Sequence, residues 1–324
     1  MKKINTILML LLISSCSTFL DKGNRLVASV SHQSIHNPQL LDCFQVKKSE
    51  LISYDLEKCG ADVVIPDSVT AIRNRAFYKN GLTSVVIPGS VTTIGEEAFA
   101  ENKITSIVIP NSVTTIHERA FRQNQLTSII NPDSLTEIEN GTFSYNQLTS
   151  ITIPNSVTII GEGSFHRNQL INIDIPNEVT TISGSAFSEN QLTSIIIPDS
   201  VKTIQDWAFY QNQLTSIIIP DNVKTIGEGA FQKNQLTDIL ISKGVRSIGK
   251  YAFYDNKLTS VRFPDSVTTI GYYAFLNNPL VAIRIGEMVT TYSRCFPKEF
   301  LTLYSRQRKA GQYQLSNGSW VKTK

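Results

Sequence analysis

Residues 192–209 decide the fold, and they read Leu192-Thr-Ser-Ile195-Ile-Ile197-Pro198-Asp-Ser-Val201-Lys-Thr-Ile204-Gln-Asp-Trp-Ala208-Phe209. The chain repeats this pattern with a period of 22 residues, most visibly at ten phenylalanines: Phe77, Phe99, Phe121, Phe143, Phe165, Phe187, Phe209, Phe231, Phe253 and Phe275. An asparagine follows each phenylalanine by three residues, from Asn80 to Asn278. Self-similarity at a period of about 20 to 50 residues indicates a solenoid of stacked coils.

The apolar positions within one unit fit neither a sustained helix nor one long strand. Ile195 and Ile197 alternate with an outward residue, which predicts a short strand with two inward side chains. The Pro-Asp-Ser that follows predicts a turn that ends strand pairing. Val201 and Ile204 then line a return limb, and Phe209 fills the middle of the coil. Because one coil cannot bury its own apolar face, we expect stacked coils to share a continuous core.

The recurrent asparagine is predicted to be structural. At a coil corner its amide can bond backbone N–H and C=O groups that the bend leaves unpaired, and stacked copies would form a ladder. Local departures from the pattern weaken individual coils. Thr142 and Ser164 replace the alanine, and Asn131 replaces the second inward aliphatic of a strand. Asn131 should lower stability unless its amide is hydrogen-bonded.

One complete copy carries a family resemblance. It reads Leu214-Thr-Ser-Ile217-Ile-Ile219-Pro-Asp-Asn-Val223-Lys-Thr-Ile226-Gly-Glu-Gly-Ala-Phe231-Gln-Lys-Asn234 and resembles the BspA-like class of bacterial surface leucine-rich repeats, over about residues 56–292. The resemblance implies a leucine-rich-repeat solenoid of ten 22-residue coils, with a parallel β-sheet on its concave face and capped ends. It also implies a role in binding, such as adhesion to host matrix or to neighbouring cells.

The segments that flank the repeats resemble caps of such arrays. Residues 52–66 are similar to an opening cap, and residues 309–320 resemble a terminal module in which a small hairpin covers the last coil. An exposed solenoid end is an unpaired sheet edge over an open core, so both ends need cover. We therefore place an N-terminal cap at residues 44–66, the solenoid at 67–292 and a C-terminal cap at 293–324.

The N-terminus predicts export and lipid attachment. Two lysines precede an apolar run from Ile7 to Ile13, which is far shorter than the roughly 20 residues that cross a bilayer. The following Ser14-Ser15-Cys16 resembles a bacterial lipobox. We interpret residues 1–15 as a lipoprotein signal peptide, Cys16 as the acylated residue and residues 16–43 as an anchor and flexible tether, on the outer membrane or cell surface. The alternative is an ordinary secreted protein with a chance cysteine.

The charge of the chain bears on its partner, and its cysteines bear on a possible disulfide. The formal net charge is +3, and it falls to +1 when residues 1–15 with their two lysines are removed, so nothing in the overall charge favours nucleic acid. Three cysteines then remain. Cys43 and Cys59 lie just ahead of the repeats and are candidates for a disulfide, although three reduced thiols including Cys295 fit equally well.

The sequence contains no recognisable catalytic or metal site. None of the four histidines, His32, His36, His117 and His166, stands at metal-ligand spacing from Cys, Asp or Glu. There is no phosphate-binding glycine loop, no nucleophile elbow and no paired catalytic carboxylate. We therefore expect a protein that is not an enzyme and needs no cofactor or metal.

If the recurrent positions are scaffold, a partner should contact an exposed position at which the repeats differ. The outward residue between the two inward strand aliphatics varies, and we call this set the variable column: Val86, Val108, Ile130, Thr152, Asp174, Ile196, Ile218, Leu240, Arg262 and Arg284. Its apolar members and terminal arginines favour a protein partner. The competing interpretation is that valine and isoleucine here reflect only β-propensity.

Two functions fit this sequence. The favoured one is an adhesin or coaggregation factor anchored through Cys16, which binds a host matrix protein or a neighbouring cell. The alternative is an envelope-structural or periplasmic scaffold on the same anchor. A carbohydrate ligand is less favoured, because the variable column has no outward aromatic residue.

Overall fold

The computed structural model describes residues 17–20, 26–29, 42–287, 289–307 and 309–323, and the chain divides into two units, Met1–Asp42 and Cys43–Lys324. In the first unit β1 (Ser17–Leu20) and β2 (Leu26–Ser29) form an antiparallel hairpin. The signal peptide at 1–15, Cys16, His32 and His36 lie outside the described residues. No helix in the described ranges is both long enough and apolar enough to cross a membrane.

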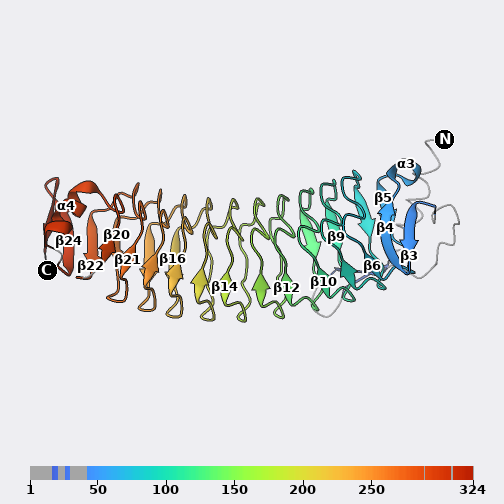
Figure 1. Ribbon diagram of the computed structural model, residues 1–324, viewed down its shortest axis with the longest axis horizontal. Coiled ribbons are helices and arrows are strands. Elements are labelled where there is room, and N and C mark those ends of the chain that lie inside the picture. Colours follow the sequence, from blue (N-terminus) through green and yellow to red (C-terminus); the bar gives the residue numbers. More distant parts are fainter. Residues whose placement is uncertain (1–16, 21–25, 30–41, 288, 308, 324) are drawn as a thin grey trace. The chain divides into compact units, whose positions relative to one another are not determined.

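The second unit is a stack of coils with a parallel row of strands on each of two sides (Figure 1). The Ile-x-Ile segments form the first row, which we call the long-strand face. It consists of β5 (Asp62–Val64), β7 (Ser84–Val86), β9 (Ser106–Val108), β11 (Ser128–Ile130), β16 (Ser216–Ile219), β18 (Asp238–Ile241), β20 (Ser260–Arg262) and β22 (Ala282–Ile285).

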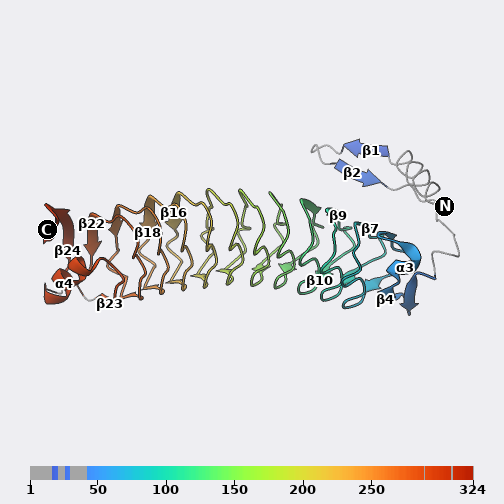
Figure 2. The same ribbon diagram turned by 90° about the horizontal axis from the view of Figure 1, so that it is seen from above.

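The return limb, for which the sequence predicted only inward side chains, forms a second parallel row that we call the short-strand ladder. Figure 2 shows β7, β9, β16 and β18 along one border of the stack and β10 and β23 along the other. The ladder consists of β6 (Ala71–Ile72), β8 (Thr93–Ile94), β10 (Thr115–Ile116), β12 (Glu137–Ile138), β13 (Ile159–Ile160), β14 (Thr181–Ile182), β15 (Thr203–Ile204), β17 (Thr225–Ile226), β19 (Ser247–Ile248), β21 (Thr269–Ile270) and β23 (Thr290–Thr291).

Parallel pairing places residues of adjacent coils side by side in nearly constant register. Ile218 lies opposite Leu240, and Thr203 lies opposite Thr225, each 22 positions apart. The long-strand face is not continuous in the described residues, because no regular strand forms on it between Ile130 and Ser216. Equivalent side chains therefore form columns along the stack, which confirms the parallel solenoid expected from the repeat.

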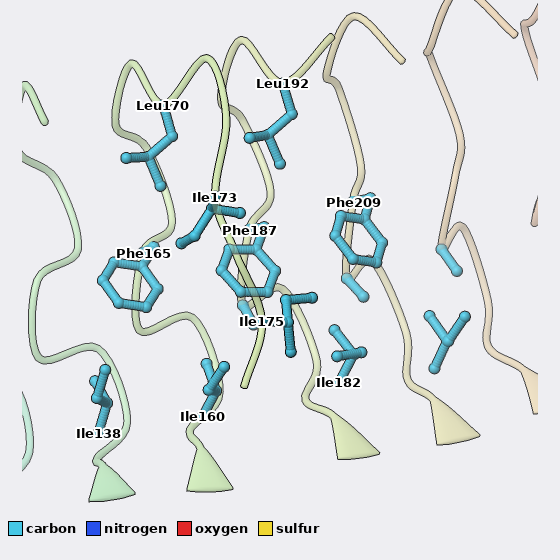
Figure 3. Packing of buried hydrophobic residues seen from close by; sticks show 14 of the residues in the cluster. Ile138, Ile160, Phe165, Leu170, Ile173, Ile175, Ile182, Phe187, Leu192 and Phe209 are labelled. Atoms are coloured by element: carbon cyan, nitrogen blue, oxygen red, sulfur yellow. The ribbon is translucent and has the colours of Figure 1, made fainter. Parts of the chain in front are cut away.

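Phenylalanines fill the centre of the stack. From Phe77 to Phe275 each ring stacks on the next, with centroids 4.9 to 5.8 Å apart and planes inclined by 2 to 19°. All ten are fully buried. Figure 3 shows Phe165, Phe187 and Phe209 in this row, with Leu170 and Leu192 on one side and Ile160 and Ile182 on the other. The phenylalanine column is thus core, as the sequence predicted.

The asparagine column bonds the coil corners, which also confirms the prediction. The amide Nδ2 of Asn190 donates to the carbonyl oxygens of Phe165 (2.9 Å) and Phe187 (3.1 Å), and its Oδ1 accepts from the backbone N–H of Leu170 (3.0 Å). The same three contacts recur from Asn102 to Asn278. Each amide therefore satisfies backbone groups of two successive coils that would otherwise be buried without partners.

A hairpin and a short helix cover the N-terminal end of the stack. Strands β3 (Phe44–Lys47) and β4 (Glu50–Tyr54) pair antiparallel, and β4 continues in parallel to β6. The helix α3 (Leu56–Cys59) follows, and a disulfide joins its last residue to Cys43. The Tyr54 ring packs 5.4 Å from that of Phe77, so this segment continues the aromatic row to the end.

The C-terminal end is covered by helix α4 (Lys298–Gln307) and by the hairpin of β24 (Gly311–Ser316) and β25 (Ser319–Lys322). Strand β24 pairs antiparallel with β22, which extends the long-strand face by two strands. Between helix α4 and this hairpin, the Phe300 ring contacts the rings of Tyr304, Tyr313 and Trp320 at centroid distances of 5.3 to 5.8 Å. These aromatic side chains close the apolar core.

The stack contains one coil more than the ten that the phenylalanine period indicates. Phe296 follows Phe275 after 21 residues and stacks on it at 5.3 Å. Cys295 therefore occupies the column in which most other coils have alanine, and its carbonyl accepts from the Phe275 N–H at 2.9 Å. The deletion of one residue hides this eleventh coil from a search at constant period.

Two departures from the repeat leave buried polar atoms without partners among the described residues. The Nδ2 of Asn131 donates to the Thr152 carbonyl at 3.4 Å, but its Oδ1 has no partner. The Ser164 hydroxyl is fully buried and has none. By contrast, the Thr142 hydroxyl in the same column donates to the Glu139 carbonyl at 2.8 Å. An unpaired buried hydroxyl costs about 1–3 kcal/mol.

We therefore predict that Ser164→Ala raises the free energy of unfolding by about 1 kcal/mol, because it removes the unpaired hydroxyl and restores the residue found in most coils. Urea unfolding followed by circular dichroism measures the change. The matched variant Thr142→Ala should lower stability by about 1 kcal/mol, since it removes a bonded hydroxyl and a buried methyl group. Equal shifts in the two variants would contradict this explanation.

Candidate partner-binding surface

The variable column lies on the outer side of the long-strand face. Its members alternate with inward side chains, so that Ile217 and Ile219 are buried while Ile218 between them points outward. All ten residues named from the sequence are exposed. Among its aliphatic members, the largest exposed fractions belong to three consecutive coils, at 83% for Ile196, 64% for Ile218 and 56% for Leu240.

The column has two aliphatic segments separated by polar residues. Val86, Val108 and Ile130 form the first, Thr152 and Asp174 interrupt it, and the second runs from Ile196 to Leu240. The structure adds Val64 of β5 to the first segment, at 49% exposure. Its neighbours Val63 and Ile65 match the two inward strand positions of the repeat. This match is the sequence signal that places Val64 in the variable column.

Two arginines end the column. Arg262 of β20 and Arg284 of β22 lie side by side in the parallel pair, and both are exposed. Neither makes an ion pair within the part of the chain that the structure describes. Like charges directly opposite each other on a sheet repel, so this end of the surface is suited to an acidic group.

Charges on another side of the coils are paired along the stack. At the turns around the phenylalanine, Arg75 Nε lies 2.7 Å from Glu97 Oε2, and Arg167 Nε lies 2.7 Å from Glu189 Oε2. Each pair joins residues 22 positions apart, and the hydrogen bond to Glu97 raises the pKa of Arg75. Each such exposed ion pair contributes little to the stability of the fold. We interpret these pairs as contacts between neighbouring coils and not as a binding site.

A shallow hollow of about 310 Å³ is lined by Asn74, Glu96, His117, Glu118 and Glu139. His117 Nδ1 lies 2.9 Å from Glu139 Oε1, which accounts for this histidine as half of a hydrogen-bonded pair. Across the described residues, no group of three His, Cys, Asp or Glu side chains is arranged to hold a metal ion.

One cluster has the residue types of a nucleophilic triad. His166 Nδ1 lies 2.6 Å from Ser188 Oγ, and its Nε2 lies 3.9 Å from Glu189 Oε1. Ser188 is buried, however, and its hydroxyl donates to the Ser185 carbonyl at 2.9 Å, so it is not available to attack a substrate. Burial lowers the pKa of His166. The cluster is part of the packing.

The cysteines have structural surroundings. Cys43 and Cys59 are joined in a disulfide, with their Cα atoms 5.9 Å apart. Cys295 is a free and buried thiol, and burial raises its pKa to about 12. Because only the thiolate is nucleophilic, Cys295 is inert in the folded protein.

Stacked parallel coils around a continuous core, with variation confined largely to exposed positions, define a leucine-rich-repeat protein. The profile described as BspA type leucine rich repeat region (6 copies) matches residues 54–171 and 158–282. These matches cover more than half of the chain, which therefore belongs to this family. A comparison with curated proteins gives no match.

Solved structures show the same fold. A leucine-rich repeat protein from Bacteroides ovatus is 21% identical with a TM-score of 0.58, and the match covers 94% of this chain and 97% of that chain. A leucine rich cell surface protein from Faecalibacterium prausnitzii is 24% identical with a TM-score of 0.50, covering 85% and 88%. The pneumococcal vaccine antigen PcpA is 17% identical with a TM-score of 0.53, covering 79% and 80%.

We predict that Cys295 resists alkylation by iodoacetamide at pH 8 in the folded protein and reacts readily in denaturant, because burial suppresses its thiolate. Mass spectrometry of a full-length Cys16→Ser chain, kept free of reductant, counts the modified thiols. Rapid labelling of Cys295 under native conditions would show that the eleventh coil is open.

Proposed function

We propose that this protein is a lipid-anchored cell-surface binding protein, of the adhesin or coaggregation type, that presents its long-strand face to a protein partner. The observation that carries the proposal is the exposure of Ile196, Ile218 and Leu240 in three adjacent coils. Apolar side chains that are grouped on a soluble surface commonly mark interaction sites.

The backbone beneath these side chains favours binding. Ile218 and Leu240 lie on the paired strands β16 and β18, whose inward residues belong to the continuous core or pack against it, so these two side chains are held on a rigid support. Ile196 lies one coil earlier, outside a regular strand, and the next residue, Ile197, is buried in the same core. A rigid surface loses little conformational entropy when a partner binds. The two arginines at the end of the column would supply a charged rim for an acidic group of the partner.

The location rests on the N-terminal sequence and on the family. Residues 13–16 have the pattern of a lipobox, which supports acylation of Cys16. Two chains on one cysteine would anchor a protein more stably than a single acyl chain. The similar protein from F. prausnitzii is described as a cell surface protein, and the BspA type repeat of this chain spans residues 54–282. Repeat solenoids of this kind generally serve as binding scaffolds.

We predict that replacing Ile196, Ile218 and Leu240 together by serine weakens partner binding at least about tenfold, because the variant removes apolar area that a partner would bury. The partner is first captured from host matrix proteins on soluble residues 17–324, and the affinity is then measured by surface plasmon resonance. Circular dichroism should be unchanged, because all three side chains point away from the core.

A matched control replaces Ile159 by serine. This isoleucine is 53% exposed but lies on the short-strand ladder, so the variant should bind normally. Unchanged affinity in the triple variant would contradict the long-strand site. Failure to capture any matrix or cell-surface protein would instead favour the envelope scaffold.

The anchor has a separate test. Cys16→Ala should abolish incorporation of radioactive palmitate and release the protein from the membrane fraction, because the acyl chains attach only through that sulfur. Labelling is measured by autoradiography after growth with the labelled fatty acid, and protease treatment of intact cells reports surface exposure. Continued labelling of the variant would contradict lipid attachment at Cys16.

A further inference from the structure

The short-strand ladder has an outward column of its own, directly before the paired residues. In most coils this position is threonine: Thr70, Thr92, Thr114, Thr136, Thr158 and Thr180 precede, and Thr268 and Thr290 follow. In the last coil Thr290 is also the first residue of β23, and its N–H donates to the Thr268 carbonyl at 2.8 Å. Three consecutive coils between them have Lys202, Lys224 and Arg246 instead. We call these three residues the basic stripe. All three are exposed.

Backbone hydrogen bonds fix the stripe as a straight row. The N–H of Lys224 donates to the Lys202 carbonyl at 2.9 Å, and the N–H of Arg246 donates to the Lys224 carbonyl at 3.0 Å. The flanking threonines are joined in the same way, through Lys202 to Thr180 and through Thr268 to Arg246. At about 4.8 Å per coil, the three cations span roughly 10 Å along the stack.

The carboxylates nearest in sequence form no ion pair with the stripe. Asp199 and Asp221 lie in the preceding turns, three residues before Lys202 and Lys224, but Asp221 pairs with Lys243 at 3.4 Å. The Nζ of Lys224 reaches only the Asp221 backbone carbonyl, at 3.4 Å. No ion pair joins the stripe to any carboxylate among the residues that the structure describes.

The fold does not require cations at these positions. Threonine occupies the equivalent site in eight other coils, and stacked like charges repel, so the stripe opposes the pairing that it lies on. On the turns around the phenylalanines, charged residues of adjacent coils instead alternate in sign, as in Arg75 with Glu97. The contrast indicates that the stripe serves an anionic ligand.

We propose that the basic stripe binds a linear polyanionic glycan, a sugar chain that carries sulfate or carboxylate groups. The stripe is one residue wide and straight, which matches an extended chain with repeated charges. Its neighbours in the coil are the hydroxyls of Thr203, Thr225 and Ser247, which can bond sugar hydroxyl groups. The column itself offers no aromatic ring on which nucleobases could stack and no apolar side chain that could enter a bilayer.

This site is independent of the long-strand face, because its residues belong to the other row of strands.

The glycan probe is heparin, and it is tested with the full-length Cys16→Ser chain, which cannot be acylated at that position. In the triple variant Lys202→Thr, Lys224→Thr, Arg246→Thr, each coil receives the residue of its neighbours, so the circular dichroism spectrum should be unchanged. We expect at least about a tenfold loss of heparin affinity at 50 mM salt, and a salt slope shallower by about 2, since three cations release roughly 0.7 counterion each.

The control variant removes the same charge elsewhere, through Lys103→Gln, Lys233→Gln and Lys257→Gln, and should retain heparin binding. The proposal is overturned if the parent chain does not bind heparin, if the stripe variant binds as the parent does, or if both triple variants lose affinity equally. It is also overturned if polyglutamate, single-stranded DNA or phosphatidylserine vesicles bind the stripe more tightly than heparin does.

Discussion

The buried asparagine amide at each coil corner is the interaction on which the rest of the structure depends. A chain that turns back on itself every 22 residues leaves backbone donors and acceptors inside the bend, where water cannot reach them. Asn190 and its equivalents satisfy these groups in their own coil and in the preceding one. Each amide thereby fixes the coil spacing as well as the bend, and this spacing lets the phenylalanine rings stack. Because the corners repeat, each remaining position of the repeat forms a column along the stack. The side chains of one column all face the core or all face outward.

The separation of scaffold from surface follows from this constraint. Positions that face the core vary little, since each must fit between copies of itself above and below. Outward positions are free of that limit, and they are where the chain differs from coil to coil. The long-strand face has aliphatic residues and then arginines, whereas the short-strand ladder has threonines interrupted by three cations. A single scaffold thus presents two chemically different surfaces on separate sides.

The sequence predicted the core better than it predicted the edges of the fold. The period identified the phenylalanine and asparagine columns, because their roles are local and identical in each coil. It did not reveal the short-strand ladder, whose two-residue strands are too brief for an alternating pattern. The shortened eleventh coil breaks the period, and Val64 lies in the segment that the sequence predicts to be the N-terminal cap. The exposure of the variable column followed from strand alternation, but its partner depends on chemistry outside this chain. The net charge of the chain does not reveal the basic stripe, because it sums over columns that the fold places on different sides of the stack.

The break in the long-strand face bears on how the stack responds to force. Regular strands are missing there between Ile130 and Ser216, and the unpaired polar atoms of Asn131 and Ser164 lie in or beside the same coils. In a linear array each coil is held only by its neighbours, so separation begins at the weakest interface. A molecule pulled between its two ends would yield first near its middle, and the blocks on either side would keep their folded surfaces. The central coils would then unfold under a load that the coils on either side withstand.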